Sequence, residues 1–226
     1  RRYGINRISI GLQSPENQEL RALGRIHNYQ QFLESYHMAR EAGFSNINID
    51  LMFAIPGQSY EGWIQNLRTV AKLGPEHISA YSLIIEEGTP FSARKLDLPD
   101  EDTEYRMYED VAAVLGKYGY YQYEISNYAK KDRNCRHNEG YWQRKDYLGL
   151  GLGAASLVGR ERFTNTSDMS EYLENSGNLE KIRTDRETLT REDEMGEFMF
   201  LGLRMTKGVS KKDFQEYFGT SIGKIY

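Results

Sequence analysis

The sequence predicts an α/β protein whose first half contains a parallel sheet. Three successive stretches before residue 120 each pair a short run of alternating apolar and polar residues with a longer run of helical periodicity. Strand then helix, repeated three times, is the pattern of βα units, in which the strands are parallel and the connections right-handed. With 226 residues the chain is long enough for one large domain and part of another.

The first βα unit is predicted over residues 6–14 and 28–43. Apolar residues occupy every second position of the first stretch, which is typical of a strand with one buried face. In the second stretch apolar residues recur at helical spacing. Asn28 is a favourable N-cap residue, and Gly43 is favourable at the C-terminal end of the helix.

The second and third units repeat this pattern. Strands are predicted over residues 45–53 and 77–85, and helices over residues 59–74 and 100–119. Each helix carries an apolar stripe that we expect to face the sheet. The stripes are Trp63, Leu67, Val70 and Ala71 in the first of these helices, and Tyr108, Val111, Ala112 and Leu115 in the second.

Polar residues gather toward the C-terminal ends of the three predicted strands. They are Gln13, Asp50 and Ser82, and we expect them on the face opposite to the aliphatic residues. In a parallel barrel, sites are built at this end of the strands. A buried Asp or Gln without a partner is costly, so both either pair internally or face a ligand. Arg25 lies in the loop after the first strand, and such a set of side chains can bind ribose hydroxyls and a carboxylate.

After residue 120 the composition of the sequence changes, and the βα pattern ends. Residues 120–129 read as a tyrosine-rich strand, residues 130–140 as a polar loop and residues 141–159 as a glycine-rich stretch. Three helices are then expected: a short one within residues 164–177, one over 190–205 and one over 208–219. Their expected caps are Ser167 or Asp168 for the first, Thr190 with Asp193 in a capping box for the second, and Ser210 with Gly219 for the third.

The stretch "RNCRHNEGYWQ" holds the only cysteine of the chain, Cys135, together with His137 and two aromatic residues. Such a group can indicate a metal site, a haem site, a nucleophile or none of these. A lone histidine in a loop is usually a surface residue. Covalent haem attachment requires C-x-x-C-H, which is absent, and no base is identifiable that would activate Cys135 as a nucleophile.

Composition narrows the class of protein. The net charge of −4, and the mixed charges of the C-terminal helix pair, argue against a nucleic-acid-binding protein. No apolar run is long enough for a membrane span, and no secretory signal is visible. A single cysteine excludes an intramolecular disulfide framework, which fits a reducing cytoplasm. The chain opens directly into a strand without an initiator methionine, so we expect a piece of a longer protein.

Several long stretches resemble a known family. "NRISIGLQS", "LRALGRIHN", "FSNINIDLMFAIPGQSYEGW" and "LGPEHISAYSLIIEEGTPF" are similar to the radical S-adenosylmethionine (radical SAM) family of oxygen-independent coproporphyrinogen III oxidase-like proteins. Within that family, "HNEGYW" resembles the H-N-x-x-Y-W signature of the haem-chaperone branch. The resemblance runs from residue 4 to about residue 219.

The resemblance implies a partial (β/α)6 barrel followed by an α+β C-terminal region with a helix pair. Residues 1–119 would hold the last three βα units, residues 120–188 an extension of strands and loops carrying HNxxYW, and residues 189–226 the start of a helical C-terminal domain. In the family a C-x3-C-x-x-C loop holds a [4Fe–4S] cluster. That loop is absent here, so the cluster ligands would lie outside this chain.

The resemblance also implies ligands for two groups of residues. Five positions match the family's contacts to S-adenosylmethionine, with Asp50 near the ribose: Gln13, Arg25, Asp50, Met52 and Ile84. Four positions match the haem-associated signature, with His137 as axial ligand of the haem iron: His137, Asn138, Tyr141 and Trp142. A further family position is matched by His27, which either faces the site or caps the helix after it.

The function implied is that of a cytoplasmic haem-binding chaperone that passes haem to an acceptor protein. S-adenosylmethionine and a [4Fe–4S] cluster would be cofactors of the intact protein. The alternative is an oxygen-independent coproporphyrinogen III oxidase, in which a radical derived from S-adenosylmethionine abstracts a substrate hydrogen. No nucleic acid and no membrane span are expected.

Overall fold

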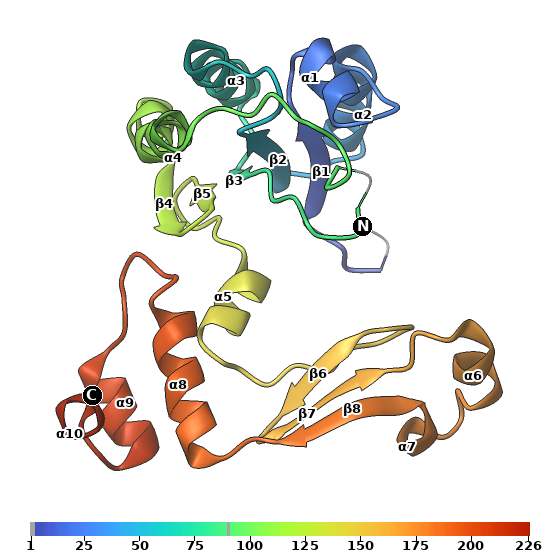
Figure 1. The fold of residues 1–226 in the computed structure, drawn as a ribbon, viewed down its shortest axis with the longest axis vertical. Helices are drawn as coiled ribbons and strands as arrows, with labels where there is room; N and C mark the ends of the chain where they lie inside the picture. The colour runs from blue at the N-terminus through green and yellow to red at the C-terminus, as the bar shows by residue number, and fades with distance from the viewer. Residues whose placement is uncertain (1–2, 90) are drawn as a thin grey trace. The chain divides into compact units, whose positions relative to one another are not determined.

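The computed structural model describes residues 3–89 and 91–226, and these form two compact units (Figure 1). The first unit ends at Asn134 and the second begins at Cys135. Residues 1, 2 and 90, which the predicted barrel segment includes, lie outside the described residues. The domain boundaries predicted after residues 119 and 188 stay predictions.

The first unit contains a five-stranded mixed sheet in the order β1-β2-β3-β5-β4. As predicted, β1 (Ile8–Gln13), β2 (Ile47–Phe53) and β3 (His77–Ser82) are parallel. The single strand predicted over 120–129 is wrong, because this stretch is a hairpin of β4 (Tyr121–Glu124) and β5 (Asn127–Ala129) that pairs antiparallel with β3. The residues between the two strands are Ile and Ser, which are not typical hairpin turn residues.

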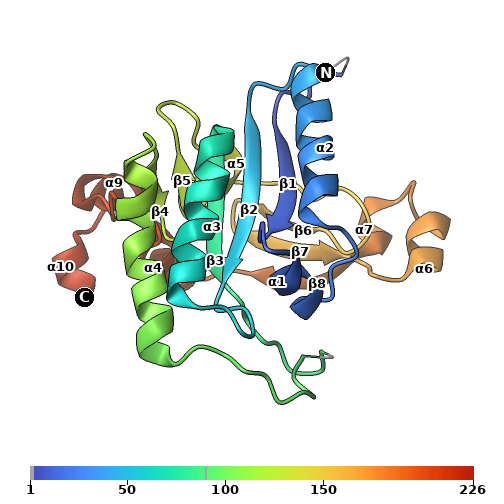
Figure 2. The same ribbon diagram turned by 90° about the horizontal axis from the view of Figure 1, so that it is seen from above.

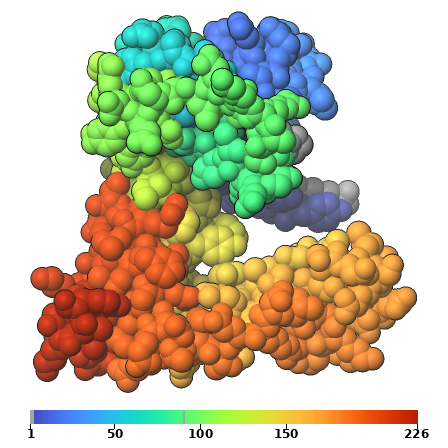
Figure 3. Space-filling model, in the orientation of Figure 1, coloured from blue at the N-terminus to red at the C-terminus, as the bar shows by residue number. Residues whose placement is uncertain are grey.

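Helices cover one face of this sheet (Figures 1 and 2). They are the predicted α2 (Tyr29–Glu41), α3 (Tyr60–Leu73) and α4 (Glu101–Gly116). The helix α1 (Asn17–Ala22), which was not predicted, lies beyond the C-terminal end of β1 (Figure 2). In the space-filling view the side chains of these helices form one continuous surface, blue to green (Figure 3).

Local sequence explains where α2 and α3 begin and end. Asn28 caps α2 in a capping box with Gln31, as its sequence position predicts. The Ser59 hydroxyl caps α3 by accepting the backbone N–H of Gly62 at 3.1 Å. Gly74 ends α3 in the left-handed conformation, which costs glycine little.

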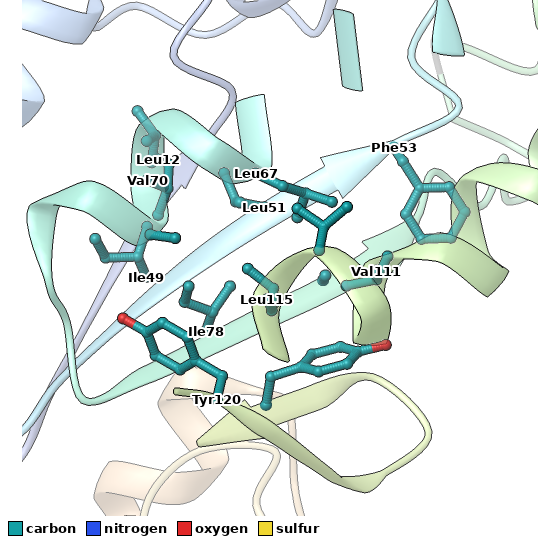
Figure 4. Packing of buried hydrophobic residues seen from close by; sticks show 14 of the residues in the cluster. Leu12, Ile49, Leu51, Phe53, Leu67, Val70, Ile78, Val111, Leu115 and Tyr120 are labelled. Carbon is teal, nitrogen blue, oxygen red and sulfur yellow. The ribbon is translucent and has the colours of Figure 1, made fainter. Parts of the chain in front are cut away.

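The core lies between the sheet and the helices α2, α3 and α4, and Figure 4 shows part of it. All four predicted stripe residues of α3 are buried. The indole N–H of Trp63 donates to the backbone oxygen of Met107 at 2.9 Å, which fastens α3 to α4. The stripe predicted for α4 is partly wrong: Ala112 is exposed, and Met107 and Val114 are buried with Val111 and Leu115. The buried stripe of α4 therefore runs through Met107, Val111, Val114 and Leu115, and Ala112 lies outside it.

The second unit contains an antiparallel sheet in the order β6-β7-β8 that was not predicted. Its strands are β6 (Ala155–Val158), β7 (Glu161–Asn165) and β8 (Arg183–Thr188), with the short helices α6 (Met169–Glu174) and α7 (Leu179–Ile182) between the last two. These strands are short and largely polar, so they lack a strong apolar alternation. Of the two caps expected for α6, Asp168 is the one used.

Four further helices belong to this unit. They are α5 (Arg136–Trp142), α8 (Arg191–Gly202), α9 (Lys211–Phe218) and α10 (Ile222–Ile225). The polar loop predicted up to residue 140 is therefore wrong from residue 136 onward. The predicted caps of α8 and α9 are confirmed, including the capping box of Thr190 with Asp193.

Ion pairs of two buried glutamates connect α8 to the sheet of the second unit. Glu197 on α8 accepts a hydrogen bond from Arg144 Nε at 2.9 Å and one from Arg162 on β7. Glu194, one turn earlier, pairs with Arg144 at 3.3 Å and with Arg160 at 3.5 Å. Removing one member of such a set leaves an uncompensated buried charge, which is strongly destabilising.

The revised stripe of α4 gives a stability test. Leu115→Ala should lower the free energy of unfolding by about 2–5 kcal/mol, because it leaves a cavity in the core. Ala112→Ser should change it by less than about 0.5 kcal/mol, because Ala112 is exposed. Urea unfolding followed by circular dichroism measures both. Equal costs for the two substitutions would contradict this orientation of α4.

Candidate functional site

Polar side chains line the face of the sheet that the helices leave uncovered. The register pairs Asp50 with Ser79 and Met52 with Tyr81, so these four side chains share one face. The alternate residues of β2, among them Leu51, are buried toward the helices. We call the set the inner polar face, and it consists of Ser9, Gln13, Asn48, Asp50, His77, Ser79 and Tyr81.

Asp50 is the central acid of the inner polar face. Its Oδ1 accepts a hydrogen bond from Asn48 Nδ2 at 2.7 Å, and its Oδ2 accepts one from Ser9 Oγ at 3.2 Å. A carboxylate offers about four acceptor positions, so roughly two remain for donors of a ligand. Because Asp50 is only half-buried, those positions are accessible.

Gln13 lies at the end of β1 in an unusual backbone conformation. Its φ is 70°, in the left-handed region that costs most residues about 1–3 kcal/mol. The side chain is buried and its Oε1 accepts a hydrogen bond from Tyr81 at 3.1 Å. Gly11 makes room for it, since a Cβ there would lie 2.8 Å from Gln13 Nε2.

Tyr81 is a site residue that the sequence reasoning missed. Its hydroxyl connects the end of β3 to the end of β1. Burial raises the pKa of the Tyr81 hydroxyl, and the charge of Asp50 raises it further. Gln13 and Arg25 act in the opposite direction on the same pKa. The exposed Arg25 therefore lies close enough to influence this hydroxyl electrostatically.

Not every predicted position joins this group. Ser82 is wrong as a member of the polar face: its register partner is the core residue Phe53, and its hydroxyl donates to Glu104 on α4. Ile84 lies beyond β3 and is 78% exposed. His27 contacts the backbone oxygen of Leu12 through Nε2 at 3.3 Å, next to the site and away from the cap of α2.

His77 is fully buried at the start of β3. Its Nδ1 lies 2.6 Å from Asn48 Oδ1, and its Nε2 lies 2.8 Å from the hydroxyl of Tyr123. Burial, assisted by the positive charge of Arg7, lowers the pKa of His77 from 6.5 to about 3. His77 is therefore neutral at physiological pH. The period-2 run of polar residues in β2 and β3 was the signal that could have found this network.

A second buried polar cluster fastens the loops at the C-terminal ends of β1 and β2. Glu19 Oε2 accepts hydrogen bonds from Ser14 at 2.6 Å, from Gln58 at 2.9 Å and from Asn66 at 2.9 Å. Ser14 follows Gln13 directly, so this cluster also fixes the backbone beside the inner polar face. We refer to it as the Glu19 cluster.

In the second unit, the HNxxYW residues lie on α5. His137 is exposed, and its ring packs edge-on against Tyr141 one turn later, with centroids 4.6 Å apart. Tyr141 packs in turn against Tyr147 at 4.7 Å. A cavity of about 200 Å³ is lined by these three rings together with Arg136, Gly140, Lys145 and Asp146.

Asn138 and Trp142 form the neighbouring pair on α5, and both are half-buried. The Arg204 guanidinium lies 4.4 Å from the centre of the Trp142 ring, a cation–π contact. The indole N–H of Trp142 is buried and has no acceptor among the described residues. Trp142 also lines a second cavity of about 390 Å³ with residues of α8 and α9.

The described residues differ in how well they fit the implied cofactors. An exposed imidazole beside two aromatic rings fits haem, whose iron accepts histidine and whose ring packs against aromatic side chains. Asp50 and Gln13 fit a nucleoside ligand. A [4Fe–4S] cluster does not fit, because in residues 3–89 and 91–226 no three His, Cys, Asp or Glu side chains are grouped for a metal, and Cys135 is the only cysteine.

Two family models match the two ends of this chain, and curated relatives match most of its length. A family model described as "Radical SAM superfamily" matches residues 1–70, and one described as "HemN C-terminal domain" matches residues 189–226. The chain is 39% identical over 227 residues to "Heme chaperone HemW" of Bacillus subtilis and 43% identical over 157 residues to that of Escherichia coli. Residues 1–70 of this chain therefore resemble the radical SAM superfamily.

The similarity to these two relatives covers 99% and 70% of this chain, but only 60% and 42% of theirs. A solved radical SAM structure, coproporphyrinogen III oxidase (HemN) from Escherichia coli, aligns over 97% of this chain and 54% of that one. The TM-score is 0.80 at 22% identity, which confirms the predicted radical SAM fold. None of the described helices is long and apolar enough to cross a membrane.

The buried His77 gives a test by pH. Its native pKa lies below that of the unfolded chain, so only the unfolded state gains a proton as the pH falls below about 6.5. The stability contributed by neutral His77 is therefore present above pH 6.5 and is lost between pH 6.5 and about 3. From pH 7 to pH 5 the wild-type chain should lose about 2 kcal/mol more unfolding free energy than His77→Gln.

Urea unfolding at the two pH values measures this difference. Parallel pH profiles for the wild-type chain and His77→Gln would show that His77 titrates normally in the folded protein.

Proposed function

We propose that this chain is part of a haem chaperone of the radical SAM superfamily, which binds haem and delivers it to an acceptor protein. The observation that supports this most directly is 39% identity to a "Heme chaperone HemW" over 99% of the chain. The HNxxYW residues on α5 support it independently, because His137 is exposed beside Tyr141 and a cavity. The relatives favour this function over the coproporphyrinogen oxidase alternative, which is supported by a fold likeness at 22% identity and by the match of residues 189–226 to the "HemN C-terminal domain" model.

In this proposal His137 is the axial ligand of the haem iron. Its ring is accessible, and the edge-on contact with Tyr141 limits how it rotates. Tyr141 and Trp142 would pack against the porphyrin, and Asn138 would complete the contact. Cys135, which precedes α5 at its N-cap position, has no role in the proposal.

The inner polar face is the proposed site for S-adenosylmethionine. Asp50 would accept the ribose hydroxyls, and Gln13 and Arg25 would contact the polar groups of the ligand. Met52 shares the face with Asp50, and the exposed Ile84 is free to make an apolar contact. Such a site would hold the S-adenosylmethionine on which a reduced [4Fe–4S] cluster of the intact protein would carry out radical chemistry. The cluster would be held by residues other than those described. We place the protein in the cytoplasm, because its single cysteine allows no disulfide within the chain.

Haem binding tests the first part of the proposal. The wild-type chain titrated with haem should develop a Soret band with near-stoichiometric binding. His137→Ala should lose the ligation signature and bind at least about tenfold more weakly, because the iron loses its axial ligand. His37→Ala is the matched control, since His37 is also an exposed helical histidine beside a tyrosine ring. Unchanged haem binding by His137→Ala would contradict the assigned ligand.

Binding of S-adenosylhomocysteine, a stable analogue, tests the second part. Asp50→Ala should weaken binding by about 10- to 150-fold, the range expected for lost hydrogen bonds to a charged group. Asp102→Ala is the control, because this exposed acid lies on α4 and away from the inner polar face. Isothermal titration calorimetry gives both affinities. If the two variants bind equally well, Asp50 is not the ribose contact.

A further inference from the structure

A chain of hydrogen bonds runs behind Asp50 from β4 to β2. The Tyr123 hydroxyl lies 2.8 Å from His77 Nε2, and His77 Nδ1 lies 2.6 Å from Asn48 Oδ1. The Asn48 amide nitrogen donates to Asp50 Oδ1 at 2.7 Å and to Ser9 Oγ at 2.6 Å. The Ser9 hydroxyl in turn donates a hydrogen bond to Asp50 Oδ2 at 3.2 Å. Both carboxylate oxygens of Asp50 are therefore held by one closed ring of donors.

The direction of every bond in this chain is determined. Asn48 Oδ1 can only accept, so His77 must carry its proton on Nδ1, and Nε2 must accept from Tyr123. Turning the Asn48 amide over would put its oxygen 2.7 Å from a carboxylate oxygen, two acceptors in contact. Ser79 Oγ also donates to Asn48 Oδ1, at 3.2 Å. The tautomer of His77 and the orientation of Asn48 thus fix each other.

Burial changes along the chain in a way that points to a ligand. Tyr123, His77 and Asn48 are buried, whereas Asp50 is half-buried and Ser9 is exposed. Polar groups are costly in the interior unless each is satisfied, and apolar residues fill the opposite face of the same strands. This hydrogen-bonded network ends at Asp50, whose carboxylate still has unused acceptor positions.

We propose that Asn48 and His77 are positioning residues that hold the Asp50 carboxylate ready for a vicinal diol, the ribose of a nucleoside ligand. The inference rests on the proposed S-adenosylmethionine site and adds the mechanism by which it recognises the sugar. Two acceptor positions of Asp50 are occupied by Asn48 and Ser9, which leaves two for the two ribose hydroxyls. Fixing the carboxylate in advance removes the entropy cost of ordering it on binding.

The test is the preference for an intact diol. The chain is titrated by calorimetry with S-adenosylhomocysteine and with its 2′-deoxy and 3′-deoxy analogues. The wild-type chain should prefer the diol by at least about tenfold over either analogue, as expected for one charge-assisted hydrogen bond. Asn48→Leu, which has a similar volume but no donor, should reduce the preference to less than about threefold.

Two further variants separate positioning from general damage to the site. Tyr123→Phe keeps the ring but releases His77 Nε2, and it should reduce the diol preference partially. Tyr81→Phe removes the bond to Gln13 within the same site but outside the chain. It should keep the diol preference at the wild-type ratio, whatever its effect on overall affinity.

The outcomes distinguish the two proposals. If Asp50→Ala loses the diol preference and Asn48→Leu retains it, the positioning role is wrong and the nucleoside site stands. If the wild-type chain does not bind S-adenosylhomocysteine, or binds it without any preference for the diol, the proposed nucleoside site and the positioning role of Asn48 and His77 are both wrong.

A measurement without ligand covers the case in which a variant does not fold. The ¹⁵N chemical shifts of the His77 ring in the wild-type chain at pH 7 report its tautomer. The proposal requires a single Nδ1–H tautomer. A ring protonated on Nε2, or an even mixture of the two forms, would overturn it.

Discussion

The register between β2 and β3 is the constraint on which the rest of the first unit depends. It places Leu51 and Phe53 toward the helices and Asp50 and Met52 on the uncovered face. A slip of one residue would exchange the two sets, exposing the core and burying an acid without partners. Stability and the proposed site are therefore properties of the same alignment. The His77–Asn48 hydrogen bond joins β3 to β2 at this register and contributes to both.

In the second unit, the HNxxYW residues are positioned by a short helix and not by the register of a sheet. The rings of His137 and Tyr141 meet because residues four apart lie on the same side of a helix, and α5 is only seven residues long. A helix this short has little stability of its own. Contacts with α8 hold it, and the turn after it contains Arg144, which is buried against Glu197. The ion pair of Arg144 with Glu197 thus helps to hold α5, on which the rings of His137 and Tyr141 are accessible to a ligand.

Sequence reasoning succeeded where structure is decided within one helical turn or one strand. The caps at Asn28, Thr190 and Ser210 are local interactions, and alternation along β2 was enough to place Asp50 on the face opposite to Leu51. Features that depend on distant pairing were missed. Tyr123 meets His77 across 46 residues of sequence, and Ser82 left the predicted site because its register partner is a core residue. The helix α5 was missed because Asn and Gly have low helix propensity, which tertiary contact overrides.

The Glu19 cluster has a consequence for how this protein can change over evolutionary time. One carboxylate oxygen serves donors from three separate segments: the end of β1, the loop after β2 and the helix α3. Replacing Glu19 alone would remove an acceptor from three buried side chains at once, whereas replacing one donor would remove a single hydrogen bond. Variation in homologous chains should therefore be concerted at these four positions. The Glu19 cluster, which contacts no proposed ligand, would then change in sequence as slowly as the residues that contact one.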